Sequence, residues 1–162
     1  KLSPIKIVLV VSNNKEAPSL NYAKINNIKN IIVTYKNKLK AEKKLLGALL
    51  KYKIRLIFLA GFMKILSKKF ILKFEGKILN IHPSLLPNYK GLNTHRRVIE
   101  NKEKFTGCTV HLVNSRLDSG KIILQKKIKI LRKDNENSLA KKVLKLEHQL
   151  YPRAIVKFLS IR

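Results

Sequence analysis

The feature that most constrains the fold is an alternation of short apolar runs with amphipathic segments. The apolar runs are rich in Ile, Val and Leu and cover residues 5–11, 30–35, 54–60 and 77–82. Segments with helical spacing lie between them, over residues 16–25, 40–52 and about 67–74. This order is typical of βαβ units, whose parallel strands are buried on both faces and read as near-continuous apolar runs. The sequence therefore predicts an α/β fold with a mostly parallel central sheet flanked by helices.

The pattern changes after residue 82. A loop rich in Pro, Gly and Asn is followed by a predicted helix, two strands and a last helical stretch, over residues 83–92, 94–101, 107–113, 122–130 and 136–160. The two strands bracket a short Leu-Asp-Ser-Gly loop, which favours an antiparallel or mixed edge at the C-terminal side of the sheet. Proline removes a helical hydrogen bond, so we expect the last helix to break near Tyr151-Pro152. With 162 residues, we expect a single domain over 1–162.

Ligands of open α/β sheets bind beyond the carboxyl ends of the strands, and three segments lie there: Ser12–Asn14, Gly61–Met63 and Asn80–Pro83. In the last of these, Asn80 and His82 are two residues apart in a strand, so both side chains face the same side. An Asn amide can donate to a developing oxyanion, and a His can act as acid, base or cation near neutral pH. The alternative is a histidine that is merely hydrogen-bonded at a strand end.

Asp118 adds weight to the functional interpretation. The chain contains only two aspartates, Asp118 and Asp134, among 36 basic residues. In the loop between two predicted strands, the Asp118 carboxylate could orient His82 or a water between them. It could also form an Asx-turn with Ser119 and Gly120, and the two roles are compatible.

The net charge of +27 raises the question of a nucleic-acid partner. The charge is spread along the chain, and the abundance of Lys, Ile and Asn (29, 19 and 14 residues) fits the codon bias of an AT-rich genome. No apolar run reaches the roughly 18–20 residues of a membrane span. The single Cys108 allows no internal disulfide, and Pro4 and two lysines interrupt the N-terminal apolar residues. We therefore expect a cytoplasmic protein without a metal, a membrane or a dedicated nucleic-acid partner.

Four ordered blocks carry a resemblance to a known family: AGFMKILS, LNIHPSLLPNYKGLNTHR, GCTVHLVNSRLDSGKIILQ and EHQLYPRAI, at residues 60–67, 79–96, 107–125 and 147–155. Together they resemble phosphoribosylglycinamide formyltransferases over most of the chain, from about Ile5 to Phe158. The resemblance implies a Rossmann-like formyltransferase fold. It also implies transfer of a formyl group from 10-formyltetrahydrofolate to the amine of N1-(5-phosphoribosyl)glycinamide, through a direct tetrahedral intermediate, in purine biosynthesis. Glycinamide ribonucleotide and the folate are the small-molecule partners that it implies.

The resemblance also implies roles for particular residues. The catalytic residues it implies are Asn80, His82 and Asp118. The folate-binding residues it implies are Phe62, Met63, Lys64, Ile65, Leu66, Leu117, Asp118 and Gly120. The nucleotide-binding residues it implies are Ile81, Pro83 and Glu147. Core packing is the alternative for residues 62–66, and a surface ion pair with lysines is the alternative for Glu147.

The sequence departs from the family in one large respect. The family opens with a strand and a phosphate-binding loop of the type GxGSN, whereas IKIVLVVSNN here aligns with the family's second strand. We therefore expect a domain that is truncated at its N-terminal side relative to the family. Smaller departures are Lys64, Ser119, Lys121 and Leu144. The alternatives are a degenerate formyltransferase without turnover, a methionyl-tRNA formyltransferase, and a basic nucleic-acid-binding module. The tRNA enzyme has Arg-Gly-Ala-Ala after its Ser-Leu-Leu-Pro segment, where this chain has KGLNTHR.

Overall fold

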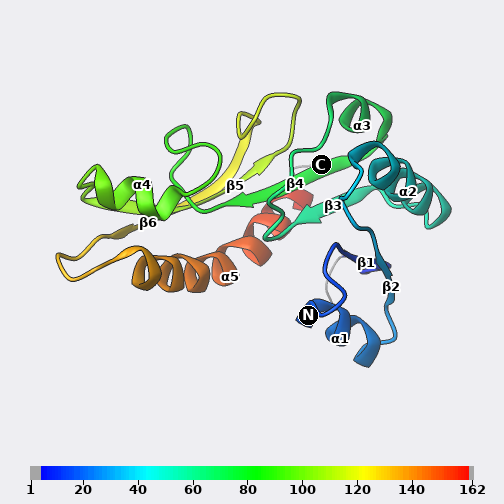
Figure 1. The fold of residues 1–162 in the computed structure, drawn as a ribbon, viewed down its shortest axis with the longest axis horizontal. Coiled ribbons are helices and arrows are strands. Elements are labelled where there is room, and N and C mark those ends of the chain that lie inside the picture. The colour runs from blue at the N-terminus through cyan, green and yellow to red at the C-terminus, as the bar shows by residue number, and fades with distance from the viewer. Residues whose placement is uncertain (1–4, 161–162) are drawn as a thin grey trace. The chain divides into compact units, whose positions relative to one another are not determined.

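The computed structural model describes residues 5–160, and it confirms the α/β fold, in which strands and helices alternate along the chain (Figure 1). Pro4 and both ends of the expected domain lie outside the described residues. The strands are β1 Leu9–Ser12, β2 Lys29–Ile32, β3 Leu56–Leu59, β4 Lys77–His82, β5 Phe105–Leu112 and β6 Ile122–Lys129. The helices are α1 Pro18–Ile25, α2 Lys38–Lys51, α3 Lys68–Lys73, α4 Thr94–Glu100 and α5 Glu136–Ser160. No helix among the described residues is long and apolar enough to cross a membrane.

The chain groups into two compact units, of which the first extends to Arg55 and also includes Leu72–Gly76. In this unit β1 and β2 form a parallel pair, with Leu9 opposite Lys29, and α1 packs against both strands. Helix α1 begins at Pro18, whose fixed φ suits the first turn of a helix. The Asn37 side chain caps α2 by accepting a hydrogen bond from the backbone amide of Lys40.

The second unit contains a four-stranded sheet in the order β3-β4-β5-β6. Strands β3 and β4 are parallel, whereas β5 is antiparallel to both β4 and β6, so the expected mixed C-terminal edge is present. The structure differs from the expected run of parallel strands in one respect. Backbone hydrogen bonds join β1 to β2 and β3 to β4, so that the parallel strands form two separate pairs among the described residues. Strand β6 is the end strand of its sheet and exposes Lys126, Lys127 and Lys129.

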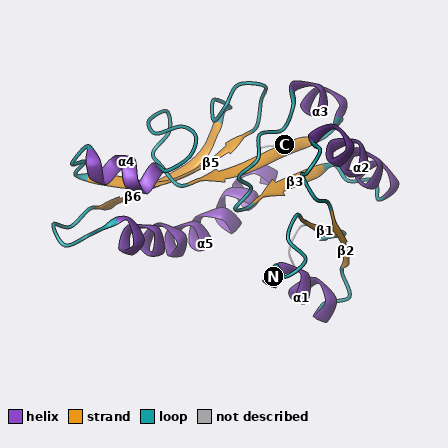
Figure 2. Cartoon of the chain, in the orientation of Figure 1, coloured by secondary structure: helices purple, strands orange, loops and turns teal. Residues whose placement is uncertain are grey.

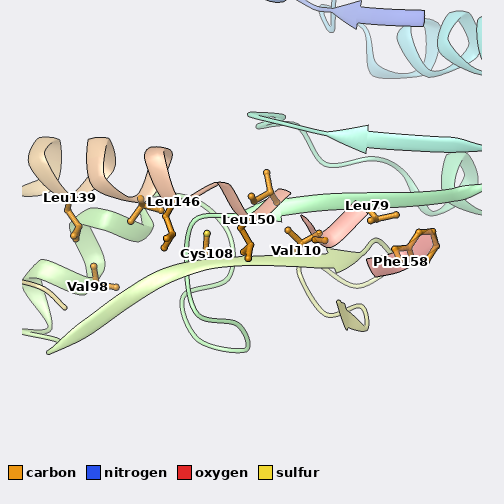
Figure 3. Close-up of a cluster of buried hydrophobic side chains, with 11 residues drawn as sticks. Leu79, Val98, Cys108, Val110, Leu139, Leu146, Leu150 and Phe158 are labelled. Atoms are coloured by element: carbon orange, nitrogen blue, oxygen red, sulfur yellow. The ribbon is translucent and has the colours of Figure 1, made fainter. Parts of the chain in front are cut away.

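Helix α5 covers one face of this sheet and supplies much of the core (Figure 3). Its buried residues recur every three or four positions, which is the spacing of one helical face. They are Leu139, Val143, Leu146, Leu150, Ala154 and Phe158. These side chains pack against Leu79 of β4, Cys108 and Val110 of β5, and Val98 of α4.

The expected break of the last helix is wrong, because α5 continues through Pro152. A proline inside a helix removes one backbone hydrogen bond and would normally end or kink the helix. Here Leu150 and Ala154 are buried on either side of it, and burial of this face offsets the lost bond. The Tyr151 hydroxyl also shares its hydrogen between the carbonyl oxygens of Leu59 and Leu79, 2.9 and 3.0 Å away, which fixes the helix to the end of β3 and the middle of β4.

A cluster of hydrogen bonds around Asp134 holds the start of α5. The Asp134 carboxylate accepts hydrogen bonds from the Lys142 ammonium at 2.6 and 2.8 Å, from the Ser138 hydroxyl at 2.9 Å and from the Leu131 amide at 2.8 Å. Asn135 caps the helix by accepting from the Ser138 amide. The Lys142 hydrogen bond is the main reason that the pKa of Asp134 is lowered from 3.8 to about 2.

This pKa shift predicts a pH-dependent contribution to stability. A carboxyl whose pKa is lowered by folding stabilises the native state above its ordinary pKa of 3.8, and that contribution is lost as the pH falls toward 2. Asp134→Asn should therefore have a lower urea midpoint of unfolding than the wild type at pH 6. The difference between the two midpoints should narrow as the pH falls from 4 to 2. Glu100→Gln, which removes an exposed carboxylate, serves as the control. A difference for Asp134→Asn that stays constant over this pH range would contradict the assignment.

Candidate active site

A cavity of about 850 Å³ lies in the second unit, beyond the carboxyl ends of β3 and β4. Its walls come mainly from five segments: residues 61–66 after β3, 80–83 at the end of β4, 91–95 before and within α4, 113–118 after β5, and one face of α5. Figure 2 draws the connecting segments in teal. Loops at this edge of a parallel pair are the usual place for ligands in α/β proteins.

Asn80 and His82 both line the cavity from β4, as the alternation of a strand requires. The Asn80 amide nitrogen lies 3.3 Å from Nε2 of His111, which is opposite it on β5. Nδ1 of His111 lies 2.9 Å from the Leu112 carbonyl oxygen, which can only accept, so the proton is on Nδ1. Nε2 of His111 is then an acceptor, and it fixes which end of the Asn80 amide is the donor. Burial, the main cause, lowers the pKa of His111, which keeps this ring neutral.

Asp118 lies beside both histidines. Its Oδ2 is 3.5 Å from Nδ1 of His82, and its Oδ1 is 3.7 Å from Nε2 of His111. The Gly91 amide donates to Oδ2 at 2.9 Å. On the other side of the His82 ring, Nε2 lies 2.9 Å from the Tyr89 carbonyl oxygen, which requires a proton on Nε2. Both ring nitrogens of His82 therefore face acceptor oxygens.

The remaining residues expected to bind the folate are placed as follows. Those that line the cavity are Phe62, Met63, Lys64, Ile65, Leu66 and Leu117. Leu66 is buried, whereas Met63 and Ile65 are 77% and 62% exposed, more than core packing would leave. Gly120 does not line the cavity. A Cβ at Gly120 would collide with the Leu112 carbonyl oxygen, so the residue allows the loop that carries Asp118 to pass close to β5.

The residues expected to bind the nucleotide, Ile81, Pro83 and Glu147, also line the cavity. Glu147 belongs to a second stripe of α5 that faces the cavity, together with Glu136, Ala140 and Leu144. Burial raises the pKa of Glu147 from 4.5 to about 7. A carboxyl with such a pKa changes its charge near neutral pH. A surface ion pair with lysines, the alternative for Glu147 from the sequence, would instead lower the pKa.

Sequence reasoning missed several polar residues of this cavity, among them His111, His95 and Glu136. His111 lies opposite Asn80 on β5, a position set by the register between the two strands, which the sequence of one strand does not reveal. His95 has a buried Nδ1 without a hydrogen-bond partner among the described residues, and burial, the main cause, lowers the pKa of its ring. No sequence signal distinguished Glu136 from the other residues of the last helix.

Comparisons with known proteins agree with this geometry. Residues 1–155 match the formyl transferase family. The chain is 42% identical to phosphoribosylglycinamide formyltransferase of Haemophilus influenzae over 158 residues, 96% of this chain and 74% of that protein. It is 38% identical to the trifunctional purine biosynthetic protein adenosine-3 of Homo sapiens, over 94% of this chain and 15% of that protein.

Solved structures give the same result. Phosphoribosylglycinamide formyltransferase from Anaplasma phagocytophilum superposes with a TM-score of 0.88 at 40% identity, over 94% of this chain and 74% of that one. The enzyme from Bacillus halodurans has a TM-score of 0.90 at 32% identity, over 97% of this chain and 82% of that one. These relatives do not favour the tRNA-modifying or the nucleic-acid-binding alternative.

Proposed function

The chain belongs to the formyl transferase family, and on that premise we propose that it formylates the amine of N1-(5-phosphoribosyl)glycinamide with 10-formyltetrahydrofolate. The reaction is a step of de novo purine biosynthesis. The observation that carries the proposal is the convergence of Asn80, His82 and Asp118 in one cavity. An amine is nucleophilic enough to attack a formyl group directly, so the protein needs to supply positioning, charge stabilisation and proton transfer.

In this mechanism the substrate amine attacks the formyl carbon, and the carbonyl π electrons move to oxygen to give a tetrahedral oxyanion. The Asn80 amide has two N–H groups, and His111 holds it so that one remains for the oxyanion. His82, protonated on both nitrogens, places positive charge beside the same oxygen, and the Asp118 carboxylate stabilises that charge. The amine loses a proton through water to the Asp118 carboxylate, which returns it through water to N10 as the intermediate collapses. Collapse of the intermediate breaks the bond to N10 of the folate, which takes up a proton.

The two substrates are proposed to occupy different walls of the cavity. The apolar side chains of residues 62–66 and Leu117 suit the flat pterin ring of the folate. Ile81, Pro83 and Glu147 suit the nucleotide, with the Glu147 carboxylate accepting from ribose hydroxyl groups. Asp118 and Gly120 shape the loop opposite the pterin.

We propose that residues 1–162 form one formyltransferase domain, supported by the family match over 1–155. These residues contain no Gly-x-Gly sequence of the kind that opens the family's phosphate loop. We also propose a cytoplasmic location, where a reducing environment suits the free thiol of Cys108. Burial, the main cause, raises the pKa of this thiol to about 12, so it stays protonated.

Glu147 predicts a pH dependence of nucleotide binding. Its carboxyl has a pKa of about 7, so it accepts hydrogen bonds from the ribose best above that pH. We expect the KM for the nucleotide to rise as the pH falls from 8 to 6, and to vary little with pH in Glu147→Gln. The KM for the folate measured on the same samples is the control. A nucleotide KM that varies with pH equally in both proteins would contradict the role of Glu147.

The experiment that tests the proposed function supplies 10-formyltetrahydrofolate and glycinamide ribonucleotide and follows deformylated folate by absorbance. We expect turnover that requires both substrates. Omission of the nucleotide controls for hydrolysis of the donor. Absence of turnover, together with binding of a folate analogue, would favour a degenerate formyltransferase that retains the folate site.

A further inference from the structure

The short loop of Tyr89, Lys90 and Gly91, here called the clamp loop, contacts both members of the proposed acid–base pair. The Tyr89 carbonyl oxygen lies 2.9 Å from Nε2 of His82, and the Gly91 amide donates to Oδ2 of Asp118 at 2.9 Å. Both members of the pair are therefore in contact with the same three-residue loop. A displacement of the clamp loop would disturb both contacts.

The clamp loop is fixed from outside the cavity by the Tyr89 side chain. The Tyr89 hydroxyl donates to Oε1 of Glu103 at 2.6 Å and accepts from the Asn101 amide at 2.9 Å. The Arg97 guanidinium lies 5.3 Å from the centre of the Tyr89 ring. It also donates to the Lys90 carbonyl oxygen at 2.7 Å. Arg97, Asn101 and Glu103, here called the outer anchor, all lie outside the set of cavity-lining residues.

The backbone of the clamp loop needs such support. Tyr89 has a φ of +55°, in the left-handed region that a bulky residue seldom adopts. Gly91, with a φ of +78°, adopts a comparable conformation without a side chain to oppose it. A strained residue persists only where its surroundings hold it in place. The contacts of the outer anchor supply that support at the residue whose carbonyl faces His82.

We propose that Tyr89 is a positioning residue. The contacts of its phenol with the outer anchor keep the clamp loop in place, and the clamp loop in turn keeps His82 and Asp118 in place. The proposal rests on the proposed function, because it assigns a role in the same reaction. The Tyr89 carbonyl keeps the proton of His82 on Nε2. Nδ1 is then the nitrogen that faces the Asp118 carboxylate, 3.5 Å from Oδ2. Asn80 remains held by His111, independently of the clamp loop.

The test compares Tyr89→Phe and Glu103→Ala with the wild type. Tyr89→Phe keeps the ring under Arg97 and removes only the hydroxyl group. We expect each variant to lower kcat by about three- to tenfold at an unchanged folate KM, the effect of losing one charge-assisted hydrogen bond. Glu103→Gln retains an acceptor oxygen and should restore most of the activity. The double variant Tyr89→Phe/Glu103→Ala should be no slower than either single variant, because both remove the same contact.

Imidazole ¹⁵N NMR of His82 supplies a readout that does not depend on turnover. In the wild type we expect the neutral ring to carry its proton on Nε2, and in both variants we expect a mixture of tautomers. Glu100→Ala, which removes an exposed carboxylate of α4 that pairs with Arg96, is the matched control and should behave as the wild type. If Tyr89→Phe fails to fold, Asn101→Ala, which removes one donor to the phenol, is used in its place.

Wild-type kcat and wild-type His82 signals in Tyr89→Phe and Glu103→Ala would overturn the proposal, as would effects that add in the double variant. If the wild-type protein does not transfer formyl groups, the proposed function fails and the NMR comparison decides the positioning role alone. Unchanged His82 tautomers in the variants would then refute it, and altered tautomers would support it.

Discussion

His82→Ala is expected to lower kcat for formyl transfer by about 10²–10⁴-fold, the range typical for a general acid–base group. The side chain is buried at the cavity wall, where it lies between the Tyr89 carbonyl oxygen and Asp118. Its removal takes away the cation beside the oxyanion and one route for the proton. The fold should persist, because His82 is outside the main apolar cluster of the second unit. Steady-state kinetics and urea unfolding, measured on the same preparation, check both expectations.

Asp118→Asn refines this result. The asparagine keeps an oxygen that accepts from the Gly91 amide and loses the charge beside His82. We expect a loss of kcat approaching that of His82→Ala, with a free energy of unfolding within about 1 kcal/mol of the wild type. Loss of circular-dichroism signal or of cooperative unfolding in either variant would make these residues structural and would remove the support for the mechanism.

The second large effect concerns stability. Leu139→Ala is expected to lower the free energy of unfolding by about 2–5 kcal/mol, the usual cost of emptying the space of a buried leucine. Leu139 is fully buried and packs in the cluster of α5, β5 and α4 (Figure 3). It also lies one residue before Ala140, which lines the cavity. Urea denaturation measured at several protein concentrations gives the free energy.

Leu144→Ala is the matched control on the same helix. Leu144 is 50% exposed and belongs to the stripe of α5 that faces the cavity. We expect its free energy of unfolding to change by no more than about 0.5–1 kcal/mol, with the larger effect on substrate KM. Equal destabilisation by the two substitutions would mean that the two faces of α5 are not divided between core and cavity.

Much of this fold follows from local patterns in the sequence. Apolar runs place the strands to within a few residues, since burial on both faces leaves little choice of residue type. The course of α5 through Pro152 could not be predicted from the proline alone. It depends on Leu150 and Ala154 finding partners in β4 and β5, which are far away in the sequence.

The candidate site, too, could be predicted from the sequence only in part. The shared orientation of Asn80 and His82 follows from the alternation of a strand, and the rarity of aspartate drew attention to Asp118. The role of His111 depends on the register between β4 and β5, which a single strand does not reveal. The contact of His82 with Tyr89 is made by a backbone carbonyl, a group that every residue carries, so no residue type marks it.

Strand β6 carries a consequence for the behaviour of the protein in concentrated solution. As the end strand of its sheet, it offers backbone donors and acceptors to which a strand of another copy could add. Lys126, Lys127 and Lys129 lie along it, and bringing two such edges together would oppose like charges. The lysine content that first suggested a nucleic-acid partner thus protects this edge against intermolecular cross-β assembly. Added salt screens that repulsion and weakens the protection.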